Sequence, residues 1–145
     1  MRDLIRVREL LKEGADVNVR DREHNETPLM LAVKFADAAM VQSLLDAGPE
    51  VNAKDDWGRT ALFYAPVSSE VFEALHKAGA DVHARDFGGN TILMRKVSES
   101  ASLADVEELL RRGVDQSIQN EAGETALDIA ESLGLVKIVE RFRRA

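Results

Sequence analysis

The chain has 145 residues, of which 45% are hydrophobic and 31% charged, an ordinary composition for one folded domain. Its 19 Lys and Arg against 26 Asp and Glu give a formal net charge of −7, which argues against nucleic acid as a partner because phosphate binding needs a cationic surface. The lack of cysteine excludes disulfides and thiolate metal sites, and no apolar run approaches the roughly 20 residues that cross a bilayer. Charges interrupt the N-terminal residues, so we expect no signal peptide, no membrane contact and a cytoplasmic protein.

Residues 1–20 predict a single helix followed by a loop. Val7, Leu10 and Leu11 fall on one helical face, and Gly14 suits the left-handed residue that ends a helix. The segment therefore resembles the second half of a two-helix unit, either a natural half-unit or a chain cut at this point.

Residues 21–54 predict a complete pair of helices. Thr27 with Pro28 is typical of a helix start, and Asp37 is the expected N-cap of a second helix that ends at Gly48. The turn that precedes Thr27 carries one residue more than the equivalent turn before Thr60.

Residues 55–85 predict a shortened pair. Thr60 precedes Gly79 by 19 residues, whereas Thr27 precedes Gly48 by 21. The two missing residues fall between the helices, where Pro66 should end the first helix and Ser68 or Ser69 should start the second.

Residues 86–119 predict a lengthened pair in which Ser102 caps the second helix. Arg95 and Lys96 stand where the other pairs carry an uncharged residue followed by Ala. Either the first helix is rotated or poorly packed here, or it offers two cations to a partner.

Residues 120–145 predict a terminal pair. Thr125 starts the first helix, Gly134 marks the turn, and Ile138, Val139 and Phe142 form the last apolar stripe.

Two short phrases recur in phase along the chain. The first phrase reads Thr27-Pro-Leu-Met, Thr60-Ala-Leu-Phe, Thr91-Ile-Leu-Met and Thr125-Ala-Leu-Asp. The second phrase begins at Gly14, Gly48, Gly79 and Gly113, as in Gly14-Ala-Asp-Val-Asn. Both phrases repeat at about 33 residues, and in this respect nearly the whole chain resembles the ankyrin repeat family.

The resemblance implies a mainly α, ankyrin-repeat solenoid, in which helix-turn-helix units stack and β-hairpin finger loops project between them. We expect one domain over residues 1–145, with a half-repeat cap at 1–20, repeats at 21–54, 55–85 and 86–119, and a C-terminal capping repeat at 120–145. In the family, a His bonds the Thr of the first phrase. Since this chain has Met30, Phe63, Met94 and Asp128 in place of that His, we expect packing to replace the lost bonds and stability to be modest.

The residues that could carry chemistry do not form a catalytic or metal-binding set. His24, His76 and His83 share no ligand spacing, and Gly88-Gly89 lacks the Lys-Ser/Thr phrase of a phosphate loop. We therefore expect no metal, no cofactor and no enzymatic activity.

The resemblance implies protein recognition, since partners in this family usually contact the finger tips and the exposed side of the first helices. Trp57 and Phe87 stand out because each is a large aromatic residue before a turn Gly, where it either anchors a partner or packs on the adjacent finger. The candidate contact residues on fingers and groove are Trp57, Phe87, Arg59, Arg85, Lys54, Asp56, Asn90, His24, Lys34, Phe35, Ser98 and Glu99.

The expected function is a non-catalytic, monomeric protein-binding module that serves as an adaptor, accessory protein or inhibitor, with a basic-faced partner favoured by the negative charge. Alternatives are an immunity-type inhibitor of a toxin or enzyme, and a self-associating scaffold in which another chain completes the half-repeat. Asn18 and Asn52 match the Asn that ankyrin-directed hydroxylases modify, although His83 and Ser117 break that pattern.

Overall fold

The computed structural model describes the backbone of residues 2–99 and 102–144, and the side chains of residues 5–99 and 102–144. The chain divides into two compact units, residues 1–81 and residues 82–145. The helices of the first unit are α1 (Arg2–Lys12), α2 (Pro28–Lys34), α3 (Ala38–Asp46), α4 (Ala61–Tyr64) and α5 (Glu70–Lys77). The helices of the second unit are α6 (Ile92–Glu99), α7 (Leu103–Arg111), α8 (Ala126–Ser132) and α9 (Val136–Arg143).

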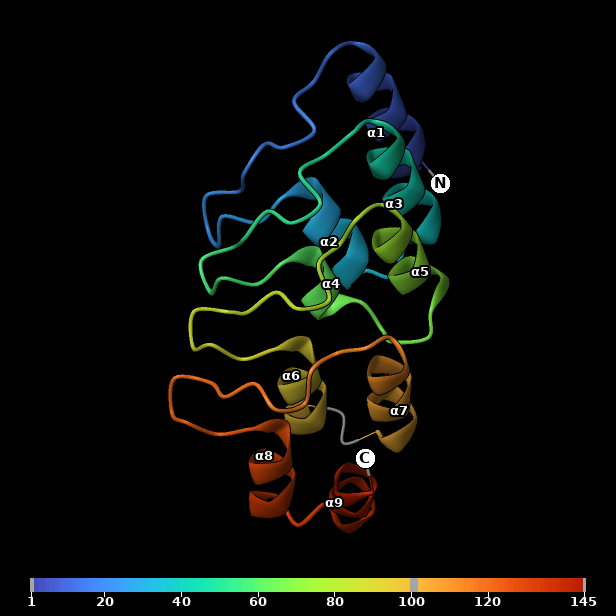
Figure 1. Ribbon diagram of the computed structural model, residues 1–145. Coiled ribbons are helices and arrows are strands. Elements are labelled where there is room, and N and C mark those ends of the chain that lie inside the picture. The colour runs from blue at the N-terminus through green and yellow to red at the C-terminus, as the bar shows by residue number, and fades with distance from the viewer. Residues whose placement is uncertain (1, 100–101, 145) are drawn as a thin grey trace. The chain divides into compact units, whose positions relative to one another are not determined.

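The first unit contains two series of helices (Figure 1). The second helices of each pair, α1, α3 and α5, pack one after another, and the first helices, α2 and α4, pack on each other. Between the series, α2 contacts α3 and α4 contacts α5. In this part of the chain the described helices are thus the single helix α1 followed by the pairs α2–α3 and α4–α5.

Side-chain caps begin most of these helices where the sequence predicts them. The Thr27 hydroxyl accepts the N–H of Met30 at 3.3 Å, and Asp37 Oδ1 accepts the N–H of Met40 at 2.9 Å. Ser69, rather than Ser68, caps α5 by accepting the N–H of Phe72 at 3.1 Å. Each cap satisfies an amide that has no partner inside its own helix.

The shortened pair is confirmed, and its first helix is the element that is shortened. α4 has only four residues before Pro66, and Ser68 turns the chain with a φ of 65°. The core nevertheless remains closed, since Leu62, Phe72 and Leu75 of this pair are at most 1% exposed.

In the second unit, α6 packs on α7 and α8, and α9 packs on α7 and α8. Leu93, Met94 and Val97 of α6 are at most 1% exposed, so the expectation of a poorly packed helix is wrong. Lys96 is only 9% exposed, and Arg95 forms an ion pair with Glu99 one turn away. The alternative of two cations offered to a partner is therefore also wrong for Lys96, because its long stem packs into the core.

The bonds of the missing His are partly replaced by polar contacts, which corrects the expectation that packing alone would replace them. In α8, Asp128 Oδ2 accepts the hydroxyl and the N–H of Thr125 at 2.6 and 2.7 Å. The Thr125 hydroxyl and N–H lower the pKa of Asp128 below its usual range because both stabilise the carboxylate. At the start of α2, the sulfur of Met30 accepts the N–H of Thr27 at 3.4 Å.

The loops between helix pairs are tied together by the two asparagines of the second phrase. Asn18 Oδ1 accepts the N–H of Glu50 at 2.8 Å, and Asn52 bonds the N–H of Asp81 and the carbonyl of Gly79. The fingers close as tight turns, and within residues 2–99 and 102–144 the recorded β pairing is the single bridge between Arg85 and Thr91.

Candidate partner-binding surface

The finger of residues 54–59 is built around the buried carboxylate of Asp55. Its Oδ1 accepts the N–H groups of Trp57 and Arg59, both at 2.9 Å, and the chain closes with an N–H to carbonyl bond from Asp55 to Arg59 at 3.0 Å. Gly58 has a φ of 78°, a conformation that a residue with a Cβ rarely adopts. Asp55 therefore fixes the turn that carries Trp57 at its tip.

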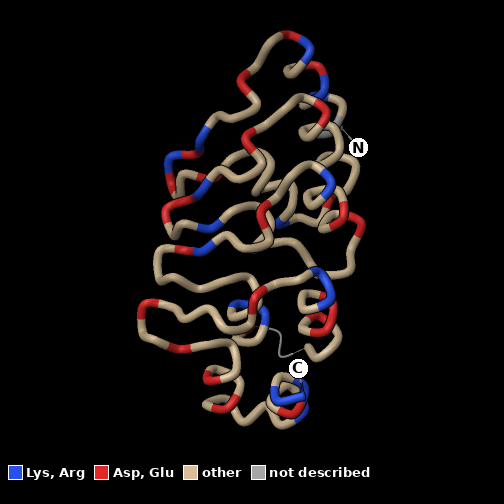
Figure 2. Tube along the Cα trace, in the orientation of Figure 1, with Lys and Arg blue, Asp and Glu red and all other residues tan. Residues whose placement is uncertain are grey.

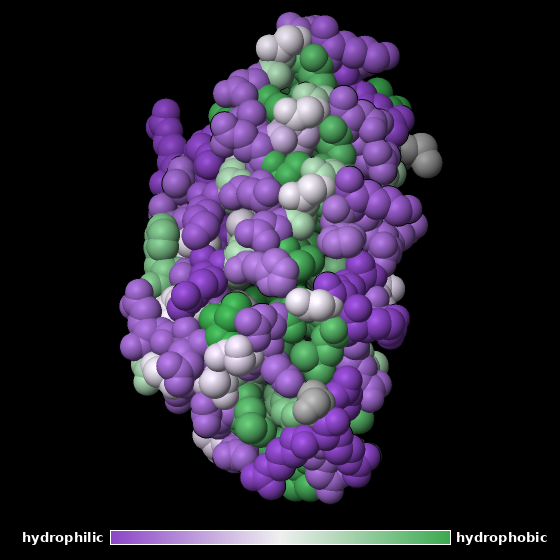
Figure 3. Space-filling model, viewed as in Figure 1, coloured by the Kyte–Doolittle hydropathy of each residue, from purple (hydrophilic) through white to green (hydrophobic). Residues whose placement is uncertain are grey.

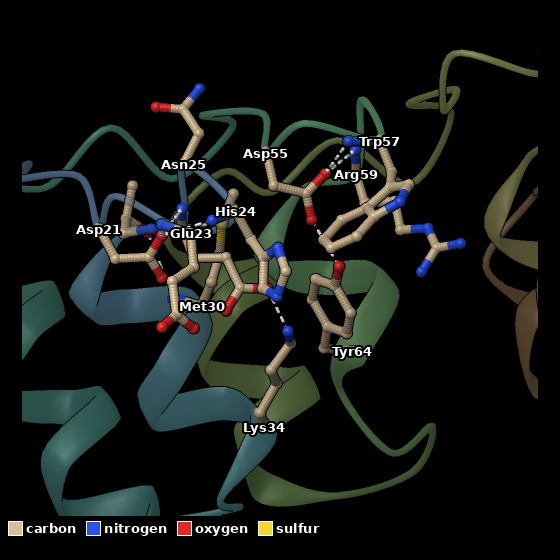
Figure 4. Close-up of polar contacts among 12 residues, drawn as sticks. Asp21, Glu23, His24, Asn25, Met30, Lys34, Asp55, Trp57, Arg59 and Tyr64 are labelled. Atoms are coloured by element: carbon tan, nitrogen blue, oxygen red, sulfur yellow. Dashed lines mark hydrogen bonds and ion pairs between the residues drawn. The ribbon is translucent and has the colours of Figure 1, made fainter.

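Trp57 is 41% exposed and also packs on the neighbouring finger (Figure 4). Its ring lies 4.8 Å from the His24 ring, centroid to centroid, with an angle of 47° between the planes. The N–H of Asp56 donates to the carbonyl of His24 at 3.1 Å, which joins the two fingers beside the ring pair. Trp57 thus fills space between the fingers and still presents part of its surface to solvent.

Arg59 lies on the other side of the Trp57 ring, with its guanidinium carbon 5.6 Å from the ring centroid, within cation–π range. Its Nε is buried and has no hydrogen-bond acceptor among the described residues. Because Nε is buried, a partner's acceptor cannot reach it, and what Arg59 contributes at this place is the cation–π contact with the ring.

Beneath the ring pair lies a chain of polar contacts from α2 to the finger (Figure 4). The Lys34 ammonium forms an ion pair with Glu26, whose side chain is 3% exposed, and lies 4.3 Å from the Tyr64 ring centroid. The Tyr64 hydroxyl in turn donates to Asp55 Oδ2. Burial of Tyr64 and its hydrogen bond to Asp55 raise the pKa of the phenol far above its usual value.

The first finger is held in the same manner by Asp21. Its Oδ1 accepts the N–H groups of Glu23 and His24 at 3.1 and 2.8 Å, and these bonds, the His24 bond foremost, hold the pKa of Asp21 below its usual range. Arg20 donates to the carbonyls of Asn25 and Lys54 at 2.8 and 2.7 Å. Asn25, in the turn with the extra residue, has a φ of 59°.

The fingers of the first unit carry both signs of charge, interspersed along each loop (Figure 2). Lys54, Asp56 and Arg59 lie within one finger, and Arg22 and Glu23 are exposed on the other. These tips are therefore not the source of the negative net charge, so a partner need not be basic where it meets them.

In the second unit, the finger of residues 85–90 places Phe87 at its tip, 62% exposed. Asp86 Oδ1 accepts the N–H groups of Gly88 and Asn90 at 2.9 Å, and Gly89 lies so close to Glu121 N that a Cβ there would approach to 3.0 Å. The backbone of this finger is thus held by an Asp carboxylate in the same way as the finger that carries Trp57.

Arg85 and Asn90, two candidate contact residues, are engaged within the second unit. Arg85 donates to the carbonyls of Gly89 and Gln119 at 2.9 and 2.7 Å, and Asn90 Oδ1 accepts Asn120 Nδ2 at 3.0 Å. These side chains hold one finger to the next.

The candidate residues Ser98, Glu99 and Phe35 lie away from the cluster around Trp57. Ser98 donates its hydroxyl to the carbonyl of Met94 at 2.9 Å, and Glu99 pairs with Arg95 on α6. Phe35, 82% exposed at the end of α2, lines an apolar groove with Val7 and Leu31 and not the cluster around Trp57.

Sequence reasoning missed Tyr64 and Glu26. Tyr64 stands inside a core phrase and reads as an apolar residue, and Glu26 reads as an exposed loop carboxylate. The one available signal was the position of Glu26 directly before Thr27, at the start of the helix that carries Lys34.

In the described residues no group of three or more His, Cys, Asp or Glu side chains is arranged to hold a metal ion. None of the helices described is both long enough and apolar enough to span a lipid bilayer.

Comparison with known proteins identifies the family. A family model of ankyrin repeats, in three copies, matches residues 3–86. The human ankyrin repeat and SOCS box protein 6 is 42% identical over 92 residues, which are 57% of this chain and 22% of that protein. An ankyrin repeat protein of Fowlpox virus (strain NVSL) is 33% identical over 141 residues, 92% of this chain and 41% of that protein.

A Notch 1 homologue of Xenopus laevis is 31% identical over 134 residues, 90% of this chain and 5% of that protein. The chain thus spans less than half of the length of each of these relatives. Repeat spacing, helix pairs, finger loops and the family match agree, and the chain belongs to the ankyrin repeat family.

Proposed function

We propose that this chain is a protein-binding module that contacts its partner with Trp57 and Arg59 of one finger and His24 of the neighbouring finger. In this proposal it acts as an adaptor, accessory protein or inhibitor without catalysis of its own. Ankyrin repeats are protein interaction modules, which gives the general class. The observation that supports the particular site is a tryptophan left 41% exposed on a turn fixed by a buried carboxylate.

The physical case for this finger is preorganisation. The Trp57 ring contacts the His24 ring and lies near the Arg59 guanidinium. Its side chain is therefore already ordered and loses little conformational entropy when a partner covers it. Aromatic and Arg side chains are enriched among the few residues that carry most of the binding energy of an interface, and Arg59 lies within cation–π range of the ring. Phe87 of the second unit, on an equally fixed turn, is a further anchor of the same proposal.

Trp57→Ala tests the site through affinity capture from native extract with quantitative mass spectrometry. We expect proteins enriched by the wild type to be lost with Trp57→Ala and reduced with Phe87→Ala, while helical circular dichroism stays unchanged. Val136→Ala is the matched control, because Val136 is 66% exposed and lies on α9 rather than on a finger. The same proteins captured equally by all variants would place the binding surface elsewhere.

A partner found this way can be checked directly, since Trp57 is the only tryptophan of the chain. Covering its ring should shift its emission to shorter wavelength as the partner is added. A saturable complex whose formation leaves the emission unchanged would show that the partner does not touch this finger.

A further inference from the structure

Tyr64 lies beneath the surface around Trp57 without belonging to either finger (Figure 4). It is the last residue of α4, and its hydroxyl donates to Oδ2 of the Asp55 carboxylate. The other oxygen of that carboxylate, Oδ1, accepts the N–H groups of Trp57 and Arg59. One buried side chain, 2% exposed, therefore joins the finger that carries Trp57 to a helix.

The next finger is closed in a different way. Asp86 has both carboxylate oxygens bonded by the side-chain amide of Asn90 in its own turn, at 3.1 and 3.2 Å. Four residues after the Thr of the first phrase, Leu31 and Arg95 stand where α4 has its tyrosine. In the described part of the chain, a side-chain bond from a helix to a finger Asp is thus recorded for the finger of residues 54–59.

Arg59 stands directly before the helix-start Thr, where the next finger has Asn90. Asn90 bonds its own Asp, whereas the Arg59 guanidinium carbon lies 5.6 Å from the Trp57 ring centroid. The same guanidinium is near the phenol, since burial and the Asp55 bond raise the pKa of Tyr64 and Arg59 acts in the opposite direction. Because the Tyr64 hydroxyl already donates to Asp55 Oδ2, Arg59 can remain beside the ring.

We propose that Tyr64 is a positioning residue of the Trp57 surface: by bonding Asp55 Oδ2, its hydroxyl keeps Arg59 beside the ring and the finger in one conformation. Without the hydroxyl, a buried carboxylate oxygen would lack a donor, which is costly. The nearby Arg59 would then turn from the ring to Asp55, and Trp57 would lose its cation–π contact. The role of Tyr64 rests on the proposed function, because it serves the same surface, but the tie itself can be tested on the free chain.

Tyr64→Phe in the full chain is the direct test, because it removes the hydroxyl and keeps the ring. Trp57 is the only tryptophan, so its emission reports on this ring alone. We expect acrylamide to quench this emission more steeply in the variant than in the wild type. The N–H groups of Trp57 and Arg59, which bond the Asp55 carboxylate, should exchange with solvent about fivefold faster by NMR.

Ser69→Ala is the matched control, since it also removes one hydroxyl bond from the first unit, the cap on the N–H of Phe72. It lies at the start of α5 and outside the finger. Quenching of Trp57 and exchange of the two finger amides should stay at the wild-type values in this variant. A loss of stability alone would change both variants alike.

A second substitution provides a rescue. Tyr64→Phe combined with Arg59→Asn gives the finger an amide at the place from which Asn90 bonds Asp86. The exchange of the Trp57 N–H should return toward the wild-type rate, because Asp55 again has a side-chain donor. Acrylamide quenching should stay steep, because the guanidinium beside the ring is gone.

The consequence for binding is measured by the affinity capture from native extract described above. Proteins that Trp57→Ala loses should be reduced about tenfold with Tyr64→Phe and captured normally with Ser69→Ala. Normal capture by Tyr64→Phe would overturn the positioning role.

The two proposals fail in different ways. Unchanged quenching and exchange in Tyr64→Phe, or equal changes in Ser69→Ala, would overturn the role of Tyr64 and leave the proposed function standing. If Trp57→Ala loses no protein, the proposed function fails, and the measurements on the free chain still decide whether Tyr64 positions the ring.

Discussion

At the scale of single residues, the polar groups that matter most here are buried ones whose role depends on contacts outside their own turn. Asp55 is 2% exposed and serves both its own turn and Tyr64 on α4. The repeated Asp of the fingers was predictable from its spacing, as turn residues usually are. The bond from Tyr64 was not, because no other repeat carries a hydroxyl at that position.

Tyr64→Phe should lower the free energy of unfolding at neutral pH by about 1 kcal/mol, because Asp55 Oδ2 then loses its donor. Urea denaturation of the two proteins at pH 7 measures this difference. A variant as stable as the wild type would mean that solvent replaces the phenol at no cost.

The same two proteins should differ in how their free energy of unfolding depends on pH in the alkaline range. The native phenol has a raised pKa, so it keeps its proton at a pH where the unfolded chain, with a Tyr pKa near 10, has lost it. The stabilising effect of the hydroxyl is therefore complete below about pH 10 and declines as the pH rises further. Since Tyr64 is the only tyrosine, the wild type minus Tyr64→Phe difference should shrink between about pH 9 and 11, and a constant difference would contradict the shift.

The pKa of Lys96 is shifted in the opposite direction from that of Tyr64. Burial lowers its pKa, so the native state carries the charged lysine less readily than the unfolded chain does. Lys96→Met keeps the packed stem without the charge, and it should raise the free energy of unfolding at pH 7 by about 1 kcal/mol. Because the unfolded chain binds more protons between the lowered pKa and 10.5, the wild type should recover part of this deficit as the pH rises toward 10.5. Chemical denaturation at pH 7 and 10 tests both statements, and a less stable variant would mean that the ammonium is favourably paired.

At the scale of helices, the sequence predicted where a helix begins better than how long it is. Thr, Asp and Ser at the expected caps bond the amides expected of them, because capping depends on neighbours in sequence. The shortening of α4 to four residues was foreseen from Pro66 and the missing residues. The packing of α6 was not, since a buried lysine stem looks in sequence like an exposed charge.

The adjacent serines before α5 allow a matched test of capping. Ser69→Ala should cost about 1 kcal/mol because the N–H of Phe72 loses its acceptor. Ser68→Ala should cost much less, since Ser68 is exposed and lies outside the helix. Thermal or urea unfolding of both variants decides, and equal effects would mean that the cap contributes no stability of its own.

At the scale of the whole chain, the 33-residue period determined the family and the order of helix pairs, because each pair must bury its apolar face on a neighbour. The candidate surface was predicted less well, since a finger residue can face a partner or its own chain. Arg85 and Asn90 bond within the second unit, whereas Trp57 packs on His24 and is also 41% exposed. Only three-dimensional contacts separate these cases.

Apolar groups reach the surface in patches between hydrophilic ones on the face seen in Figure 3, and the chain carries a net charge of −7. Like charges repel between copies at low ionic strength. We therefore expect a monomer of 16.0 kDa by light scattering across a wide concentration range. The measurement should be repeated at high salt, where repulsion is screened. A mass that stays at the monomer value there would show that the surfaces themselves do not pair, whereas a mass that rises with salt would mean that charge alone keeps the copies apart and that this chain self-associates.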